Sequence, residues 1–599
     1  MKKLLSSLFC MLVITVFSYA GTIIDVTNFG ARPDSGQDAM TAVRKAIAAC
    51  KGKSDPVLFF PKGRYDFFPK TSPIGLEIKG LKNIVVEGNG SEIVYHGTMK
   101  VALIDNCEQV TIRNLSVDWD RPFLSQGEIV KVSSSYIDVR FDKQQYPYVI
   151  EKNKLLFVGE NWKYPVLTYF TNLYEKKSRE FMYNTWDAPL GDIFEKKAVE
   201  RKKGIVRFYG SVPMKPAKGS IIAMRSMKDY LFGFDVENSR NVTFQNIRVY
   251  HCMSHAFFGK HTENITLDNA FAEARKEKGR VFSSACDAAH FMNCKGLIKV
   301  VNCAPTGNGD DFLNVHGRYF QILRLVDKKT VEVKSTDVEI LKDEDMWIVD
   351  KNTMKRGTVL HVSSVTSNTG NKDNASFRVI FDKAIPSTLK VGDCLESKTW
   401  TAAVEVRNCR MLKTNRGHGV LVATPQNVVI EDNYFNTVGA AIKMAGDMSF
   451  WFESGSNGNV TIRNNVFENC LTSGQAPRNV GKWGNAVITM MPSLEPTNSQ
   501  TATFHNNIII ENNTFKVFDA PILYARSVGS IRFTGNRIQQ TSAYQPYTWQ
   551  RTAFLLDGCK NVSIEGNIWD EKFTARKVQV QHMNVSDVSC SDQRFGIQR

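Results

Sequence analysis

The sequence predicts an all-β fold, a right-handed parallel β-helix that carries two small β-barrel insertions. The first observation is a nine-residue motif that recurs along the chain and alternates apolar with polar residues, as a half-buried strand does. The second is that only one segment shows helical periodicity. The clearest copies of the motif are Asn427–Phe435, Asn459–Phe467, Asn507–Phe515 and Asn561–Trp569.

The spacing of the copies separates the β-helix from other repeat folds. Copies start at Asn241 and Asn264, 23 residues apart, and at Asn427 and Asn459, 32 residues apart. A β-propeller needs about 40 residues per unit, and leucine-rich repeats show a leucine spacing that is absent here. Asparagine at both ends of the motif predicts tight turns, because it tolerates the left-handed conformation. Looser copies start at Asn83, Gln109, Ala403 and Ser530.

The first 20 residues predict a secretory signal peptide. Lys2 and Lys3 precede an apolar run, Leu4–Phe17, and Ser18-Tyr19-Ala20 forms a small-residue cleavage site. No other stretch approaches the about 18 apolar residues of a membrane span. We therefore expect an exported chain, periplasmic or secreted, without stable membrane insertion.

The remaining chain divides by where the repeat is present. Asp38–Lys51 has apolar residues on one helical face and is expected to cap the open end of the β-helix. The repeat fades twice, where the sequence reads as antiparallel strands. Because both insertions lie near the candidate site in sequence, we expect them to wall a cleft. The predicted parts are 21–125 (cap and first coils), 126–227 (inserted β-barrel), 228–318 (coils with the site), 319–398 (second inserted β-barrel) and 399–599 (C-terminal coils).

Charge and cysteine content exclude some classes. The formal net charge is +16, but the basic residues are scattered and no nucleic-acid motif occurs, so no nucleic-acid partner is expected. Five of the 12 cysteines follow asparagine at the edge of strand-like runs, a position that suits small buried residues. We expect mostly free, buried thiols. The oligomeric state is not predicted.

Three aspartates form the candidate catalytic site. Asp287 and Asp310 are 23 residues apart, which equals one repeat, and parallel strands stack about 4.8 Å apart. Gly307 and Gly309 indicate a turn or bulge that can bring both Asp310 and Asp311 toward solvent. The three carboxylates are therefore expected on one face. Turn-forming aspartates and a calcium site are the alternatives.

Clustered carboxylates suit glycosidic bond cleavage. One group protonates the leaving oxygen and another acts as base or nucleophile. A neighbouring charge raises a carboxyl pKa and keeps that group protonated. The spacing alone leaves the stereochemistry open.

Four further residues are candidate substrate ligands: His316, Arg416, His418 and Trp451. His418 lies between two glycines and either contacts a sugar or is a plain turn histidine. Trp483 and Trp186 are further candidates for stacking on a sugar, and core packing is the alternative. His290, three residues after Asp287, is expected to point elsewhere and to be structural. Zinc, EF-hand, dinucleotide and serine-elbow motifs are absent, and no cofactor is expected.

The chain resembles a known enzyme family. Its start, Asp25–Asp34, is similar to pectate-lyase-like β-helix proteins. The block Ser284–Phe291, followed by Gly307–Gly317, resembles glycoside hydrolase family 110, the bacterial exo-α-1,3-galactosidases. The resemblance covers nearly the whole mature chain. It implies catalytic roles for Asp287, Asp310 and Asp311.

The resemblance also implies a reaction. It is metal-independent hydrolysis with inversion of the anomeric carbon. The implied substrates are terminal α-1,3-galactose of blood group B antigens and, in one subfamily, linear α-1,3-galactosyl glycans. Two alternatives stay open: a polygalacturonase-like β-helix glycosidase and a glycan-binding β-helix protein without activity.

Overall fold

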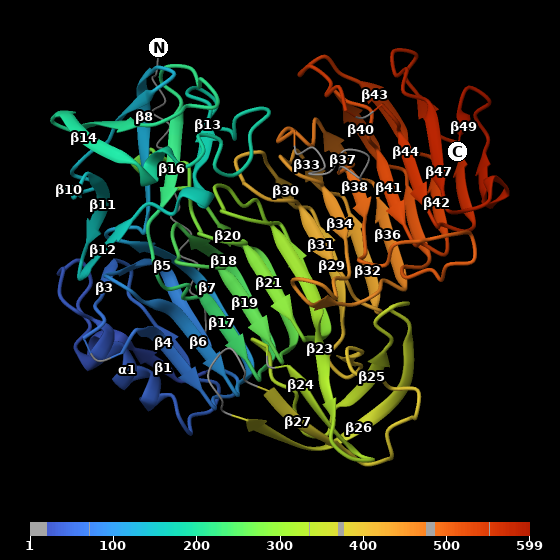
Figure 1. Cartoon of the computed structure of the whole chain (residues 1–599). Coiled ribbons are helices and arrows are strands. Elements are labelled where there is room, and N and C mark those ends of the chain that lie inside the picture. Colours follow the sequence, from blue (N-terminus) through green and yellow to red (C-terminus); the bar gives the residue numbers. More distant parts are fainter. Residues whose placement is uncertain are drawn as a thin grey trace, which may run out of the picture.

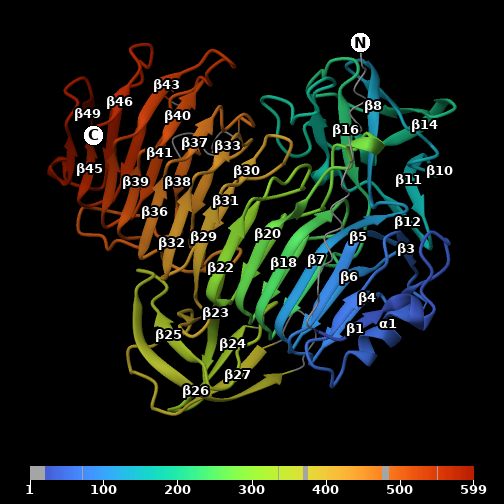
Figure 2. The ribbon, with the colours of Figure 1, turned by 180° about the vertical axis from the view of Figure 1, so that it is seen from behind.

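The computed structural model describes residues 21–70, 72–334, 336–368, 376–474, 485–549 and 551–598. The predicted signal peptide and Trp483 lie outside these residues. The described chain forms a parallel β-helix with two antiparallel insertions, which confirms the predicted fold class (Figures 1 and 2). None of its helices is both long and apolar enough to cross a membrane.

One long parallel sheet runs along the β-helix from end to end (Figure 2). Its strands are β1 (Ile23–Asp25), β2 (Val57–Phe59), β3 (Arg64–Phe67), β5 (Val85–Tyr95), β7 (Glu108–Trp119), β18 (Arg240–Val249), β20 (Glu263–Ala272), β22 (Lys295–Val301), β29 (Ala402–Arg407), β32 (Asn427–Glu431), β36 (Asn459–Arg463), β39 (Ile508–Glu511), β42 (Ile531–Thr534), β45 (Val562–Glu565) and β48 (Val588–Cys590).

A second parallel face carries the candidate site, and a shorter third face lines the C-terminal coils. The second face comprises β4 (Ile74–Lys79), β6 (Lys100–Asp105), β17 (Phe234–Glu237), β19 (Phe257–Lys260), β21 (Ala289–Met292), β23 (Leu313–Leu325), β31 (Val420–Val422), β34 (Ile442–Met444), β38 (Ile488–Met490), β41 (Leu523–Arg526), β44 (Phe554–Asp557), β47 (Lys577–Gln581) and β49 (Gly596–Gln598). The third comprises β30 (Arg410–Met411), β33 (Tyr434–Phe435), β37 (Val466–Glu468), β40 (Thr514–Val517), β43 (Arg537–Gln540) and β46 (Ile568–Trp569).

The predicted cap helix is present as α1 (Met40–Ala49) beside β1 and β4 at the N-terminal end (Figure 1). Its buried face includes Val43, Ala46 and Ile47, which join the main hydrophobic core. The short 3-10 helices are η1 (Val26–Phe29), η2 (Thr168–Phe170), η3 (Ile193–Glu195), η4 (Lys276–Lys278) and η6 (Val585–Asp587).

The copies of the recurring motif stack in register, and this stacking explains the second asparagine of each copy. Asn427 pairs with Asn459, and the following apolar positions form buried columns. The sequence suggested a left-handed conformation for the asparagine near the end of each copy, but this asparagine does not adopt it. The residue before it takes that conformation, as at Asn464, with φ 56°. The second asparagines instead form a buried ladder in which each side-chain amide donates to the next carbonyl oxygen, through Asn433, Asn465, Asn513, Asn536 and Asn567.

The first insertion lies between β7 and β18 and is antiparallel. Its six-stranded sheet has the order β13-β16-β8-β9-β15-β14, and β10-β11-β12 form a separate small sheet. The strands are β8 (Leu124–Val132), β9 (Tyr136–Arg140), β10 (Tyr148–Glu151), β11 (Lys154–Gly159), β12 (Trp162–Pro165), β13 (Asn172–Tyr174), β14 (Lys197–Lys202), β15 (Ile205–Tyr209) and β16 (Ile221–Arg225).

The second insertion grows out of β23, whose far half pairs antiparallel with β24 and β28. Its core includes Phe258 and Met292 from the second face, so it covers the outer side of β19 and β21. A short strand, β35 (Glu453–Ser454), adds to β23 at Gly317. The other strands are β24 (Thr330–Lys334), β25 (Asp345–Val349), β26 (Arg356–Asn368), β27 (Ser376–Phe381) and β28 (Cys394–Ser397).

The cysteines are as the sequence predicts. All eleven in the described residues are unpaired, and nine of them are buried. The five asparagines that precede cysteines have positive φ, so each turns the chain just before a buried thiol. These five are Asn106, Asn293, Asn302, Asn408 and Asn469.

Candidate active site

The candidate site lies where strands of the second face begin. Asp287 comes just before β21, and Asp311 just before β23. Ala289 pairs with Leu313, so two residues earlier on each strand Asp287 is level with Asp311. The sequence spacing had matched Asp287 with Asp310. The coil is therefore one residue longer than the 23-residue repeat, because the chain between the two aspartates includes the irregular turn around Gly309.

The three aspartates lie together, as the sequence predicts. One carboxylate oxygen from each of Asp287, Asp310 and Asp311 lies within 4.8 Å of the other two. The Asp311 backbone N–H also donates to Asp287 Oδ1 at 3.1 Å. Their exposure differs: the Asp310 side chain is 39% exposed, whereas Asp287 and Asp311 are buried. The prediction that both Asp310 and Asp311 face solvent is therefore wrong for Asp311.

Glycines allow the neighbouring coil to approach this cluster. A Cβ on Gly417 would lie 2.4 Å from Asp311 Oδ1 and 2.5 Å from the Asp310 carbonyl carbon. With no Cβ there, the His418 backbone N–H reaches Asp311 Oδ1 at 2.6 Å. A backbone donor is thus aimed at a buried carboxylate, which offsets part of the cost of burying it.

Arg416 links the cluster to the first insertion. Its guanidinium pairs with Asp310 and, on its other side, with Asp187, where Nε donates to Oδ1 at 3.0 Å. Its charge also lies 4.7 Å from the ring centre of Trp186. Trp186 and Asp187 follow β13 in the insertion, so this insertion forms part of the site wall. Sequence reasoning missed Asp187 because nothing in its neighbourhood repeats.

His418 packs beside the same insertion. Its ring centre lies 6.1 Å from that of Trp186, and its Nδ1 accepts a hydrogen bond from the Ala440 backbone at 2.8 Å. This bond places the ring proton of neutral His418 on Nε2. Burial lowers the pKa of His418 well below its usual value, with Lys443 and Arg416 adding to the effect. The His418 ring is therefore neutral, and the backbone N–H of this residue makes the bond to Asp311.

Two histidines hold Asp287. His290 Nδ1 lies 2.7 Å from Asp287 Oδ2, and His255 Nδ1 lies 3.3 Å from the same oxygen. The prediction that His290 points elsewhere is wrong, because Asp287 lies in the turn before the strand and its side chain folds toward His290. His255 is a residue that sequence reasoning missed. The strand pairing of Phe257 with Ala289 places it one coil before Asp287, so an aligned repeat would have found it.

His316 and Trp451 lie away from the three carboxylates. His316 is buried and contacts His290, with 2.8 Å between their Nε2 atoms. Its contact with the aspartate cluster runs through His290. Trp451 is 65% exposed and packs edge-on against Phe450, in the chain just before β35. Their predicted substrate-binding roles stay predictions.

The cluster separates the acidities of its carboxyl groups. Burial acts to raise the pKa of Asp287, but His255 and His290 outweigh it and hold that pKa well below its usual value. Burial raises the pKa of Asp311 far above its usual value, and the charges of Asp310 and Asp287 add to this. Loss of surrounding water also raises the pKa of Asp310, against the lowering effect of Arg416. Divergent acidities are typical of acid–base sites.

Three groups in the described residues have atoms close enough to hold a metal ion. For the aspartate cluster the fit is poor: Ca²⁺ takes six to eight oxygens, and three carboxylates already bonded to Arg416 and to backbone N–H groups offer few. The groups are Asp287/Asp310/Asp311, His255/Asp287/His290 and His96/Asp120/Glu160.

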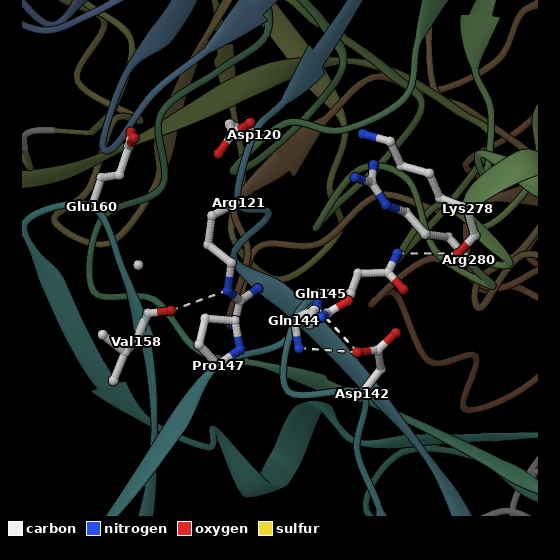
Figure 3. Close-up of a pocket in the computed structure, with 11 residues that line it drawn as sticks. Asp120, Arg121, Asp142, Gln144, Gln145, Pro147, Val158, Glu160, Lys278 and Arg280 are labelled. Atoms are coloured by element: carbon white, nitrogen blue, oxygen red, sulfur yellow. Dashed lines mark hydrogen bonds between the residues drawn. The ribbon is translucent and has the colours of Figure 1, made fainter. Parts of the chain in front are cut away.

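A cavity of about 690 Å³ lies elsewhere, between the first insertion and the segment that follows β20 (Figure 3). Arg121 lies within it and donates from Nε to the Val158 carbonyl at 3.0 Å. Gln145 donates to the Lys278 carbonyl across it. None of the predicted site residues that the structure describes lines this cavity, so its size does not mark the reacting centre.

The fold and the cluster together define a class, a β-helix protein with an acid–base carboxylate site of the kind used by glycosidases. Comparison with known proteins places it further. A family model described as GLAA-B beta-barrel domain I matches residues 125–222. The chain is 33% identical to alpha-1,3-galactosidase B of Bacteroides thetaiotaomicron over 99% of both chains. It is 30% identical to alpha-1,3-galactosidase A of Bacteroides fragilis, over 94% of this chain and 95% of that one.

The chain therefore belongs to the alpha-1,3-galactosidase family, glycoside hydrolase family 110, and is a glycoside hydrolase. This finding argues against the alternative of a glycan-binding β-helix protein without activity. Among solved structures, an exopolygalacturonase from Thermotoga maritima matches with TM-score 0.41 and 11% identity, over 92% of this chain and 91% of that one. A mannuronan C-5 epimerase A-module from Azotobacter vinelandii matches with TM-score 0.40 and 10% identity, over 91% and 99%.

Proposed function

We propose that this enzyme removes terminal α-1,3-linked galactose from blood group B-type glycans and from linear α-1,3-galactosyl glycans. The named activity of its relatives supports the linkage. The blood group substrate follows from the family resemblance. We also propose that it acts outside the cytoplasm after removal of residues 1–20, because that segment has the pattern of a signal peptide.

The observation that carries the mechanism is that three adjacent carboxyl groups differ in exposure and acidity. We assign Asp310 as the general acid, because it is the exposed member and its pKa is raised. We assign Asp287 as the general base, because its pKa is lowered and it is ionised. Asp311 lies between them in this scheme and helps to hold the attacking water. The sequence alone had favoured an acid and a base within the Asp310/Asp311 pair.

The reaction then balances as a single displacement. Asp310 gives its proton to the glycosidic oxygen as the bond from that oxygen to the anomeric carbon breaks. A water forms the new bond from the opposite face and loses a proton to Asp287. Arg416 pairs with the Asp310 carboxylate that results, which favours proton release.

Inversion is proposed from the family resemblance. Inverting carboxyl pairs are typically about 6.5–9.5 Å apart, to leave room for water. The nearest oxygens here lie within 4.8 Å, a separation that does not by itself select inversion. The stereochemistry is therefore a direct object of the test.

The test incubates the purified enzyme with B trisaccharide, with a linear α-1,3-galactosyl trisaccharide and with polygalacturonate, each with and without EDTA. NMR follows the anomer of the first product. We expect galactose released from the galactosyl substrates as the β-anomer, at the same rate with EDTA. Activity on polygalacturonate alone would favour the polygalacturonase-like alternative, and first release of α-galactose would overturn inversion. Loss of activity with EDTA would favour the alternative in which the three aspartates form a calcium site.

A further inference from the structure

A chain of buried hydrogen bonds runs from the candidate base to the backbone of β23. His290 Nδ1 contacts Asp287 Oδ2 at 2.7 Å. His290 Nε2 contacts His316 Nε2 at 2.8 Å. His316 Nδ1 contacts the Gly317 carbonyl oxygen at 2.6 Å. Both histidines are buried, so water cannot supply the missing donors or acceptors.

This chain of contacts holds one proton more than two neutral histidines supply. A carboxylate oxygen accepts at one end and a carbonyl oxygen at the other, so each of the three contacts needs its own proton. Two neutral imidazoles bring only two N–H groups. The contact between the two Nε2 atoms is the decisive one, because two bare nitrogens would repel at 2.8 Å. Asp287, His290 and His316 together therefore carry one extra proton and no net charge.

The surroundings favour that proton on the histidine pair. An imidazole has an ordinary pKa about 2.5 units above that of an aspartate carboxyl group. The Asp311 backbone N–H donates to Asp287 Oδ1, which favours the ionised carboxylate. Glu453 Oε1 lies 3.6 Å from His316 Nε2, the atom that also contacts His290, and places a second negative charge beside the pair.

Other groups oppose this arrangement. Burial lowers the pKa of His290, and His255 adds to that effect, while Asp287 acts to raise it. Asp310 and Asp311 place further negative charge next to Asp287, and Arg225 and Arg416 place positive charge near Asp310. The contact distances require the extra proton in either placement, and the ordinary pKa order together with the Asp311 N–H and Glu453 favours the histidine pair over Asp287.

We propose that His290 and His316 are positioning residues that share one buried proton with Asp287 and keep it an oriented, ionised base. This inference rests on the proposed function, since it needs Asp287 to act as the base. Glu453 is the outer counter-charge of the pair. The segment between β34 and β36 supports this end of the chain, because it contains β35, which carries Glu453 and pairs with β23. The arrangement explains how three carboxylates can lie together while one of them stays ionised.

The key variant is His316→Gln, because it breaks the chain without touching Asp287. We expect kcat to fall by about 10-fold to 100-fold, part of the total that a general base contributes, with little change in KM. Loss of the shared positive charge raises the pKa of Asp287, so the acidic limb of kcat/KM moves to higher pH. Glu453→Gln, which is expected to fold because its side chain is partly exposed, removes a negative charge that stabilises the shared proton on the histidine pair and should lower kcat by less than His316→Gln does.

A matched control separates this role from simple packing. His505→Gln removes another fully buried histidine, bonded to the Asn457 backbone, far from the aspartates in sequence. It should lower the melting temperature and leave the acidic limb unchanged. An acidic limb that stays in place in His316→Gln would overturn the His290–His316 relay, that is, the pair that shares one proton with Asp287.

The failure of the relay and of the proposed function give different results. Asp287→Asn that keeps wild-type activity would remove the base assignment, and the relay with it. Asp287→Asn that is inactive, together with an unmoved acidic limb in His316→Gln, would remove the relay alone. His290→Asn adds a positive arm: its amide can still donate to Asp287, so it should keep more activity than His290→Leu.

Discussion

The pair between Arg416 and Asp187 predicts that the first insertion tunes the general acid from a distance. The change is Asp187→Asn, which keeps the shape of the side chain and removes its charge. Asp187 Oδ1 accepts from Arg416 Nε at 3.0 Å and from Asn172 Nδ2 at 2.9 Å. The side chains of Arg416 and Asp187 are 15% and 19% exposed, so the pair is largely shielded from water.

The size of the stability loss follows from the hydrogen bond to Arg416 that Asp187→Asn removes. Hydrogen bonds to charged groups are worth about 1.5–3 kcal/mol, and asparagine retains one of the two to Arg416, so the unfolding free energy should fall by about 1–2 kcal/mol. Arg416 then holds Asp310 in a less fixed position. A loss of about 1.4 kcal/mol in the transition state corresponds to a tenfold lower kcat.

The charge of Asp187 determines the direction in which the pH profile should shift. Asp187 raises the pKa of Asp310, so its removal lowers that pKa. The acid must be protonated to act, and the basic limb of kcat/KM should therefore move to lower pH. The assay is galactose release from B trisaccharide across pH, with thermal unfolding measured in parallel.

The control is Asp337→Asn, which breaks a comparable arginine pair, with Arg318, at a site where Asp337 is 53% exposed. Exposed pairs contribute about 0–1 kcal/mol, and this one has no link to Asp310. If Asp187→Asn matches this control in kcat and in the position of the basic limb, Asp187 does not influence Asp310 through Arg416.

Two further predictions test the local architecture. Gly417→Ala should lower activity by about 100-fold or more and destabilise the protein by about 1–3 kcal/mol. The reason is that the new Cβ would meet Asp311 and the Asp310 backbone at about 2.5 Å. The control Gly357→Ala, whose new Cβ would have its nearest neighbour 3.5 Å away, should be nearly neutral in both assays. Asn513→Ala should cost about 1–3 kcal/mol in chemical denaturation, because it removes the ladder bonds from Asn465 to Asn513 and from Asn513 to Asn536. The exposed Gln426→Ala should cost far less, and equal losses would contradict a stabilising role of the ladder.

Much of the fold could be predicted because the coil repeats. Apolar alternation gave the strands, and the motif starts at Asn427 and Asn459 are paired in the structure. The one-residue shift that aligns Asp287 with Asp311 could not be read from the sequence. It depends on how the irregular turn at Gly309 is accommodated, and only strand pairing records that.

The candidate site could be predicted only in part. Asp287, Asp310 and Asp311 were accessible because they sit one coil apart, and the structure brings them together with Arg416. Asp187 could not be predicted, because it comes from an insertion without a repeat and reaches the site through the tertiary fold. His290 was misjudged by strand alternation, which does not apply to a side chain in the preceding turn.

The most direct test of the central claim compares two leaving groups in Asp310→Asn. Hydrolysis of a galactosyl disaccharide needs protonation of the leaving oxygen, whereas α-galactosyl fluoride needs little. If Asp310 is the general acid, kcat/KM should fall by about 10²–10⁴-fold on the disaccharide and by about 10-fold or less on the fluoride. Equal losses on both substrates, or full activity on the disaccharide in a folded variant, would contradict the assignment.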